Sequence, residues 1–315
     1  SGYSRLCALV SLRDAGAALA VKPLAVGFRV EHPQSFINQA TYGEDLADRA
    51  IVAKNRRRSE QVDDAATTEK GESGKAPLPV ASYRLAADVG RSAYSFCMCP
   101  GGQIVPAATK PDLMVVNGMS FSRRNSKWAT AALVVSVAAD DPVLEPYSGH
   151  GSIKALSFQR DLERRAAVLG GGDFTCPVHR LDDFVSDRPP TTRLRRHAIL
   201  DSSYRLGVKE ADCRSILPPE LSQALATAAQ DHFERKMPGF IEHGLLHAVE
   251  TRTSSPVQVT RSNVTLQSTT IKQLFPCGEG AGYAGGIVSA ALDGIRVARA
   301  VHASFSSHSG SNLDR

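Results

Sequence analysis

Hydrophobic positions along the middle of the chain recur with the periods typical of strands. Residues 24–30 alternate between apolar and other types, and residues 114–121 and 131–137 are rich in β-branched side chains. Residues 92–106 read as strand, Pro-Gly-Gly turn and strand, which predicts a hairpin. Residues 244–259 return to strand character. We therefore expect a large, mixed and mostly antiparallel sheet.

Segments with helical spacing flank and interrupt these strands. Residues 6–20 and 158–169 carry apolar side chains at helical steps, and the glycines at 170–172 provide a cap for the second segment. Residues 212–233 predict a helix that the prolines at 218–219 interrupt. Together with the sheet, these helices predict an α+β or α/β fold.

The last predicted helix has apolar and small residues on one face, at steps of three and four. The other face is polar, and Asp293 and Arg296 are spaced to pair with each other. Small side chains would let this helix lie close to a sheet. The apolar face consists of Ile287, Ala290, Ala291, Gly294, Ile295, Ala298 and Val301.

A glycine-rich turn precedes that helix, with the G-x-G-x-x-G pattern of a dinucleotide loop at residues 280–285. Only one helix and a polar tail follow, so the turn cannot open a βαβ unit. We expect a helix N-terminus whose backbone N–H groups attract a phosphate or another electron-rich group. The alternative is a tight loop that leads into a packed helix and holds no ligand.

Composition and charge narrow the class of protein. The chain has 315 residues, of which 42% are hydrophobic and 22% charged, an ordinary composition for one large or two smaller domains. No apolar run approaches the roughly 20 residues that cross a bilayer, and the opening residues lack the order of a signal peptide. The net charge is only +5, and the arginines at 56–58 and 193–196 lack interleaved aromatic residues. We expect neither a membrane nor a nucleic-acid partner.

Further residue types bear on compartment and metal binding. Six cysteines without metal-site spacing predict reduced thiols and an intracellular location, with cytoplasm and organelles, plastids included, left open. His243, His247 and Glu250 would form a metal triad on a helix, but strand and turn residues follow at once, so we expect structural histidines and no metal.

Residues 48–75 are polar and predict a flexible insertion, with a docking or targeting segment as the alternative. The chain opens at Ser1 without a methionine, which suggests a fragment.

Several stretches, in the same order along the chain, resemble a known family: the FAD-dependent dehydrogenase-like proteins, or FAD-utilizing dehydrogenases. The resemblance extends from Gly2 to about Val301, apart from the predicted insertion. The stretches that carry it are residues 22–34, 94–102, 116–120, 249–257 and 276–287.

This resemblance implies an incomplete flavoprotein fold of the FAD/NAD(P)-binding type. Members of the family carry an N-terminal Rossmann half that holds the ADP part of FAD, and this chain resembles the portion that follows it. The implied division is a remnant helix of the FAD-binding domain at 1–21, a substrate domain at 22–262, the C-terminal part of the FAD-binding domain at 263–303, and a tail at 304–315.

The resemblance also implies FAD as the cofactor and hydride transfer between an unknown small substrate and the flavin, with NAD(P)H as a candidate electron donor. Glu279 matches an acidic residue placed beside the ribityl and pyrophosphate region, and residues 280–286 match the turn at the pyrophosphate and the flavin edge. The isolated chain would hold FAD weakly or not at all, so the alternative is a non-catalytic remnant or a partner-binding module. The implied cofactor-binding residues are Gly278, Glu279, Gly280, Gly282, Tyr283, Gly285, Gly286 and Ile287.

Three residues are candidates for catalysis. Cys97 and Cys99 would share one face of a strand and line the substrate side of the flavin, one of them as a redox thiol. A pair of buried, small hydrophobic side chains is an equal alternative. Arg252 would position an anionic substrate or the isoalloxazine, or else belong to a structural ion-pair cluster. Candidates for the opposite wall are Arg29, Glu31 and His32.

Overall fold

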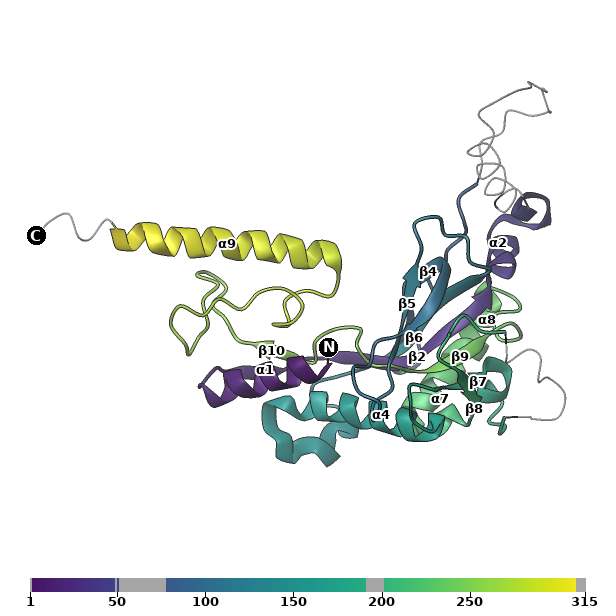
Figure 1. Ribbon diagram of the computed structural model, residues 1–315, viewed down its shortest axis with the longest axis horizontal. Helices are drawn as coiled ribbons and strands as arrows, with labels where there is room; N and C mark the ends of the chain where they lie inside the picture. Colours follow the sequence, from purple (N-terminus) through teal and green to yellow (C-terminus); the bar gives the residue numbers. More distant parts are fainter. Residues whose placement is uncertain (1, 49, 51–77, 191–200, 310–315) are drawn as a thin grey trace, which may run out of the picture.

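The computed structural model describes residues 2–48, 50, 78–190 and 201–309 and has a mixed α+β fold (Figure 1). Its frame is a sheet of eight strands and a second sheet of two strands. The helices α4 (Lys154–Gly170) and α7 (Pro219–Ala228) lie beside the large sheet, whereas α9 (Ile287–Ser309) lies apart from it (Figure 1).

The large sheet has the strand order β3-β4-β6-β2-β9-β7-β8, and β5 pairs with β4. All of these pairs are antiparallel except β7 with β8. The small sheet pairs β1 (Leu19–Val21) with β10 (Val257–Val259). The strands of the large sheet are β2 (Leu24–Pro33), β3 (Ala86–Asp88), β4 (Ser92–Pro106), β5 (Val116–Ser120), β6 (Trp128–Val137), β7 (Cys176–Arg180), β8 (Val208–Glu210) and β9 (Leu245–Glu250).

The helices follow the predicted stop signals. Gly171 ends α4 in the left-handed conformation, and Pro219 opens α7 after the break at Pro218. Within the described ranges, no helix combines the length and the apolar character that crossing a membrane would require. The other helical elements are α1 (Gly2–Asp14), α2 (Gln34–Tyr42), η1 (Pro142–Ile153), α5 (Leu181–Val185), η2 (Cys213–Ser215), η3 (Ala229–Phe233) and α8 (Glu234–Lys236).

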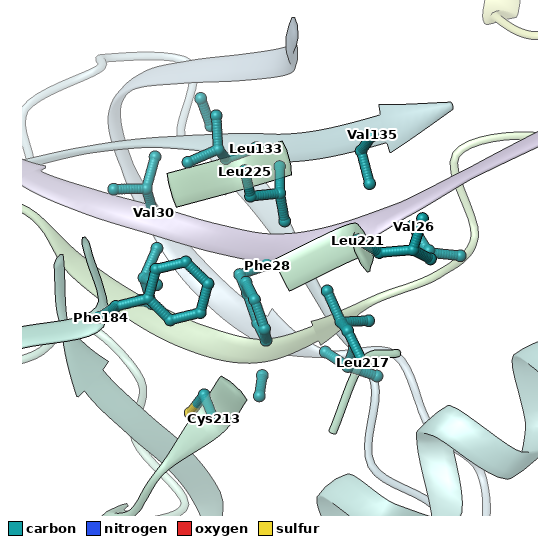
Figure 2. Close-up of a cluster of buried hydrophobic side chains, with 14 of the residues drawn as sticks. Val26, Phe28, Val30, Leu133, Val135, Phe184, Cys213, Leu217, Leu221 and Leu225 are labelled. Carbon is teal, nitrogen blue, oxygen red and sulfur yellow. The ribbon is translucent and has the colours of Figure 1, made fainter. Parts of the chain in front are cut away.

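The main hydrophobic core lies between the large sheet and the helices. Val26, Phe28 and Val30 alternate along β2, and each is 0% exposed. They pack in one cluster with Leu221 and Leu225 of α7 (Figure 2). Burying a large apolar side chain contributes roughly 1.5–3 kcal/mol, so this cluster determines which side of β2 faces the helices. The intervening residues of β2 therefore face the opposite side of the sheet.

The predicted hairpin at residues 92–106 is wrong, because β4 runs through the Pro-Gly-Gly sequence as one strand. Its register with β6 shifts between Phe96 and Cys99 and again between Cys99 and Gly102. Proline lacks an N–H group and is tolerated in sheets at such irregular positions. From Gly102 onwards β4 also pairs with β5, and these tertiary contacts override the local turn signal.

Three other expectations need correction or fall outside the described residues. The helix expected at 6–20 ends at Asp14, and strand β1 follows the turn at Gly16, whose φ is +89°. The strand expected at 244–259 is divided between β9 and β10, which belong to different sheets. The predicted insertion at 48–75 lies outside the described residues, apart from Asp48 and Ala50.

The expectation that α9 packs its apolar face against a sheet is also wrong. Ile287 is 91% exposed and Ile295 is 51% exposed, whereas Asp293 and Val297 are buried at 6% and 5%. Arg261 accounts for this rotation of the helix, because its guanidinium donates two hydrogen bonds to the Asp293 carboxylate at 2.6 and 3.0 Å. This ion pair, between residues 32 positions apart in sequence, thus holds the face of α9 that carries Asp293 and Val297 inward.

Candidate functional site

The side of the large sheet away from the main core is polar and buried. Residues paired across an antiparallel ladder share a face, and Arg29 of β2 pairs with Ala132 of β6 and with His247 of β9. Arg29 and His247 are both 0% exposed, and Glu31, two residues along β2, is 1% exposed. We call this side, which carries Arg29, Glu31, Thr130, His247 and Glu250, the polar face.

Arg29 connects four neighbouring strands through its guanidinium group. We call Arg29 and the five residues that its guanidinium contacts the arginine hub. Its shortest contacts run from Nη2 to the Cys97 carbonyl oxygen, at 2.6 Å, and to Cys99 Sγ, at 3.2 Å. A buried cation is tolerated only when hydrogen bonds and opposite charge compensate for the lost water. The remaining partners are Thr130 Oγ1 at 3.2 Å, Glu250 Oε2 at 3.4 Å and Asn117 Oδ1 at 3.5 Å.

Gly118 is required by the position of this guanidinium. A Cβ atom on residue 118 would lie 1.9 Å from Arg29 Nη2 and 2.7 Å from Thr130 Oγ1. Every side chain other than hydrogen would therefore displace the arginine. The adjacent Asn117 accepts a hydrogen bond from the Gly118 backbone N–H at 2.7 Å, which holds its side chain at the hub.

The irregular part of β4 brings both candidate thiols to the hub. Cys97 has a φ of +43°, and its side chain is exposed, whereas Cys99 is partly buried. Burial raises the pKa of the Cys97 thiol; the charge of Arg29 opposes that rise, and the charges of Glu250 and Glu279 add to it. The structure thus places Cys99 against Arg29 by its sulfur and Cys97 by its carbonyl oxygen.

Glu250 is the acidic member of the hub. Burial raises the pKa of its carboxyl group to about 7, and the nearby charge of Arg29 opposes the rise. A carboxyl group with such a pKa can carry or release a proton near neutral pH, which is the property required of a general acid or base.

A second polar cluster lies beside the hub on the same face. Glu31 accepts hydrogen bonds from the backbone N–H and the hydroxyl of Ser203, and burial raises the pKa of its carboxyl group to about 7. The Ser202 hydroxyl lies 2.7 Å from His247 Nε2, and burial lowers the pKa of His247 to about 4. The histidine is therefore neutral at physiological pH. No group of three metal-binding side chains was found in the part of the chain that the structure describes.

Arg252 lies in a structural ion pair. Its Nε and Nη2 atoms donate to the two carboxylate oxygens of Glu163 on α4, at 2.8 and 2.6 Å, and Nη1 donates to the Ala107 carbonyl oxygen at 3.0 Å. The Thr251 hydroxyl donates to the same carboxylate at 2.8 Å. These contacts fix the segment after β9 to α4, and a role for Arg252 towards a substrate stays a prediction.

The glycine-rich turn before α9 is held by three connected contacts. The Gly278 N–H donates to Asp293 Oδ2 at 2.9 Å, and the Tyr283 hydroxyl donates to the Val259 carbonyl oxygen at 2.9 Å. The Arg261 guanidinium lies 3.6 Å from the centre of the Tyr283 ring. The turn is thus anchored to β10 at one end and to α9 at the other.

The contacts of the chain explain why glycine is needed at some positions of this turn and not at others. Gly282 packs against β10, because a Cβ atom there would lie 2.7 Å from the Val257 carbonyl oxygen. Gly280 and Gly285 would meet nothing within 4 Å, and neither has a positive φ. Contacts within the described chain therefore do not require glycine at 280 and 285. Glycine at such positions fits a ligand that approaches the backbone closely, as the pyrophosphate of FAD would.

Two parts of the predicted site converge in space. The charge of Glu279, in the turn, contributes to the raised pKa of Cys97, in β4, so the two side chains lie within electrostatic range of each other. Ile287, at the start of α9, is exposed and next to the half-buried Gly286. Two segments about 180 residues apart in sequence thus lie near each other in the fold.

Sequence reasoning missed the residues that hold the Arg29 guanidinium in place, namely Asn117, Gly118 and Thr130, and it did not identify Glu250 as an acid. A signal for the hub does exist at Arg29 and Glu31, which are charged residues in an otherwise apolar strand. Such residues are almost never fully buried unless they are paired. The pairing partners lie 70 to 221 positions away, at Cys99, Thr130 and Glu250.

Comparison with known proteins identifies the family of the chain. Residues 55–253 match the family described as FAD-dependent protein, C-terminal domain-like. A relative from Clostridium beijerinckii (strain ATCC 51743 / NCIMB 8052), described as an uncharacterized protein, is 36% identical over 288 residues, or 90% of this chain and 47% of the relative. The chain thus spans about half the length of that curated relative. Because the family match covers more than half of the chain, this protein belongs to the family of FAD-dependent proteins of the C-terminal domain-like type.

Proposed function

We propose that this chain is the C-terminal portion of an FAD-dependent oxidoreductase, in which hydride passes between a small substrate and the flavin. Family membership supports FAD dependence in general. The observation that carries the proposal is the open space at Gly280 and Gly285 in the glycine-rich turn, in which Glu279 lies within electrostatic range of Cys97 at the arginine hub. This arrangement would place the cofactor-binding turn and a polar, partly exposed substrate wall on either side of one region.

The residues of this chain would divide the work between cofactor and substrate. Gly280 and Gly285 leave open space where a pyrophosphate would approach the backbone, and the carboxylate of Glu279 would accept a hydrogen bond from a ribityl hydroxyl. When bound, FAD supplies the ring that accepts or donates hydride. On the substrate side, Glu250 would hold or release the proton that accompanies hydride transfer, and Arg29 would keep its carboxyl group in place.

The ADP-binding half of the cofactor site would come from sequence outside this chain. The chain spans 47% of the length of the relative from Clostridium beijerinckii, which leaves room in that relative for a further domain. NAD(P)H is the proposed electron donor. In this proposal the chain is an incomplete FAD/NAD(P)-binding fold, and its domains are divided after residues 21, 262 and 303.

The test is FAD binding by the longer product of the same reading frame, compared with residues 1–315, measured by flavin absorbance and fluorescence. In the longer product, Gly285→Ala is expected to weaken FAD binding on the order of tenfold, because the added methyl group would occupy the cofactor's space. Gly149→Ala is the matched control, since a Cβ atom there also meets nothing within 4 Å. A longer product without bound flavin, or one in which both variants bind FAD equally, would contradict the proposal.

A non-catalytic, partner-binding module is the second candidate. It is favoured by the exposed apolar side chains of α9, among which Ile287, Val288 and Leu292 are 91%, 73% and 58% exposed. Exposed rows of this kind are typical of interaction surfaces. A longer product that binds a protein partner through α9 but never binds flavin would establish this candidate instead.

A further inference from the structure

Cys97 and Cys99 differ in their surroundings in a way that separates two chemical tasks. The Cys97 side chain is exposed, whereas Cys99 is partly buried and accepts a hydrogen bond from Arg29 Nη2 at 3.2 Å. A cation that donates an N–H to sulfur stabilises negative charge there. One thiol is thus accessible to another molecule, and the other lies against a positively charged hydrogen-bond donor.

The backbone between the two cysteines departs from a flat strand. In a flat strand, Cα atoms two residues apart are separated by about 6.6 Å, close to the upper limit of about 6.8 Å that a disulfide spans. Here the strand is irregular, with a positive φ at Cys97 and a register shift before Cys99. Cys99 Sγ lies only 3.4 Å from the Cys97 carbonyl oxygen, so its side chain turns back towards residue 97.

We propose that Cys97 and Cys99 form a redox-active dithiol/disulfide pair whose substrates are small disulfides and the thiols derived from them. This inference deepens the proposed function, and it rests on that function for the source of electrons. It assigns the substrate class of the same site and gives each thiol a separate task. Cys97 exchanges with the substrate, and Cys99 opens or closes the internal disulfide.

The exchange balances without any further reagent. The Cys97 sulfur attacks a substrate disulfide RSSR, the S–S bond breaks, and one RSH leaves with the Cys97 proton. The Cys99 sulfur then attacks the Cys97 sulfur of the mixed disulfide, the second RSH leaves with the Cys99 proton, and the internal disulfide forms. The two cysteines are oxidised and the substrate is reduced by two electrons. Return to the dithiol takes two electrons and two protons, for which reduced flavin is the donor class.

The surroundings of the two sulfur atoms fit the reverse direction of the exchange. At Cys97, partial burial raises the pKa of the thiol and the charge of Arg29 lowers it, so the forward step requires the proton to leave this sulfur as it attacks the substrate disulfide. In the reverse direction a substrate thiolate would attack the accessible Cys97 sulfur, and the Cys99 sulfur would leave next to the Arg29 guanidinium that donates a hydrogen bond to it.

The test uses the full chain with Cys7→Ser and Cys277→Ser, which removes the other exposed thiols, while Cys176 and Cys213 stay buried. The protein is equilibrated with mixtures of reduced and oxidised glutathione, quenched with acid and alkylated, and its intact mass and peptide map are then measured. We expect the loss of both alkylation sites in one two-electron step, with a peptide that links Cys97 to Cys99.

Single variants provide the matched controls. Cys99→Ser should stop at a stable glutathione adduct on Cys97, and Cys97→Ser should show no internal disulfide and slower modification. An adduct that persists on Cys97 with both cysteines present, or two thiols that remain free throughout, would overturn the proposal. These readouts need no FAD. A pair that closes in a protein whose longer form never binds flavin would remove only the flavin proposal, and a flavin-binding protein with an open pair would remove only this inference.

Discussion

The polar face buries charged side chains, whereas helix α9 exposes apolar ones. On the polar face, the charged Arg29 is 0% exposed and the acidic Glu250 is 3% exposed. On α9, the apolar Ile287 and Val288 are 91% and 73% exposed. Both arrangements oppose the simple preference for apolar residues inside, but the polar face compensates its buried charges within the chain.

The two regions differ in whether the chain itself supplies partners for the unusual side chains. Arg29 finds its hydrogen-bond partners in β4, β5, β6 and β9, so its burial needs no other molecule. Within the described residues, α9 is attached mainly through Asp293 and Val297, and its other apolar side chains stay in contact with solvent. We therefore expect substitutions on the polar face to change the stability of the chain itself and substitutions on α9 to change what it binds.

The largest expected effect follows removal of the central cation. Arg29→Met should lower the free energy of unfolding by about 3–5 kcal/mol, because it leaves the Glu250 carboxyl group and the Cys97 carbonyl oxygen without their buried partner. Urea denaturation of the whole chain measures this loss. Arg299→Met on the exposed surface of α9 is the control and should stay within about 0.5 kcal/mol. Equal effects at the two sites would remove the contrast between the regions.

The next effect concerns the pH dependence of stability. Burial raises the pKa of Glu31 from 4.5 to about 7, so the folded state keeps a proton that the unfolded state has lost between these values. Stability from this group is full below pH 4.5 and is lost as pH rises through 7, on the order of 3 kcal/mol. Glu31→Gln should therefore flatten the decline in unfolding free energy between pH 5 and pH 8.

Asp293 provides the opposite case in the C-terminal region. Hydrogen bonds from Arg261 lower the pKa of its carboxyl group below 3.8, so its contribution is present at neutral pH and is lost as the solution becomes acidic. Asp293→Asn should reduce stability at pH 7 and leave it nearly unchanged at the lowest pH tested. A Glu31 variant that followed the same pH profile as the Asp293 variant would contradict our account of the buried carboxyl group.

Two glycine-to-alanine substitutions should change the stability of the chain in opposite directions. Gly118→Ala should destabilise the chain by about 1–3 kcal/mol, because the added methyl group overlaps the Arg29 guanidinium. Gly294→Ala, in the middle of α9, meets nothing within 4 Å and should stabilise the chain by roughly 0.5–1 kcal/mol. Thermal unfolding of both variants is the measurement. Destabilisation by both would show that α9 is packed more closely than its exposed surface indicates.

The smallest effect on stability is expected at the exposed apolar row. Leu292→Gln should change the free energy of unfolding by less than about 0.5 kcal/mol, because the leucine is 58% exposed. The same change should weaken association with the proposed ADP-binding half or with a partner, as measured by binding of the separately produced segments. Unchanged association would show that this row is not an interface.

The sequence by itself determined the elements whose signals are local. Alternation predicted β2, β-branched residues predicted β5 and β6, and the glycines at 170–172 correctly ended α4. The glycine-rich turn into α9 and the family were also recognisable, because several residues in a fixed order carried them. Periodicity and capping act between residues a few positions apart, so they can be read from the chain directly.

Only the tertiary structure decided how these elements meet. Pro100 and its glycines look like a turn, yet pairing with β5 and β6 extends β4 through them. Arg29 became the centre of the site because β4 and β9 bring Cys99 and Glu250 to it from distant positions. Helix α9 turns the face that carries Asp293 inward, where the carboxylate pairs with Arg261, and leaves Ile287 and Ile295 exposed. Each outcome depends on contacts between residues far apart in sequence, whose energies outweigh local preference only once the fold has formed.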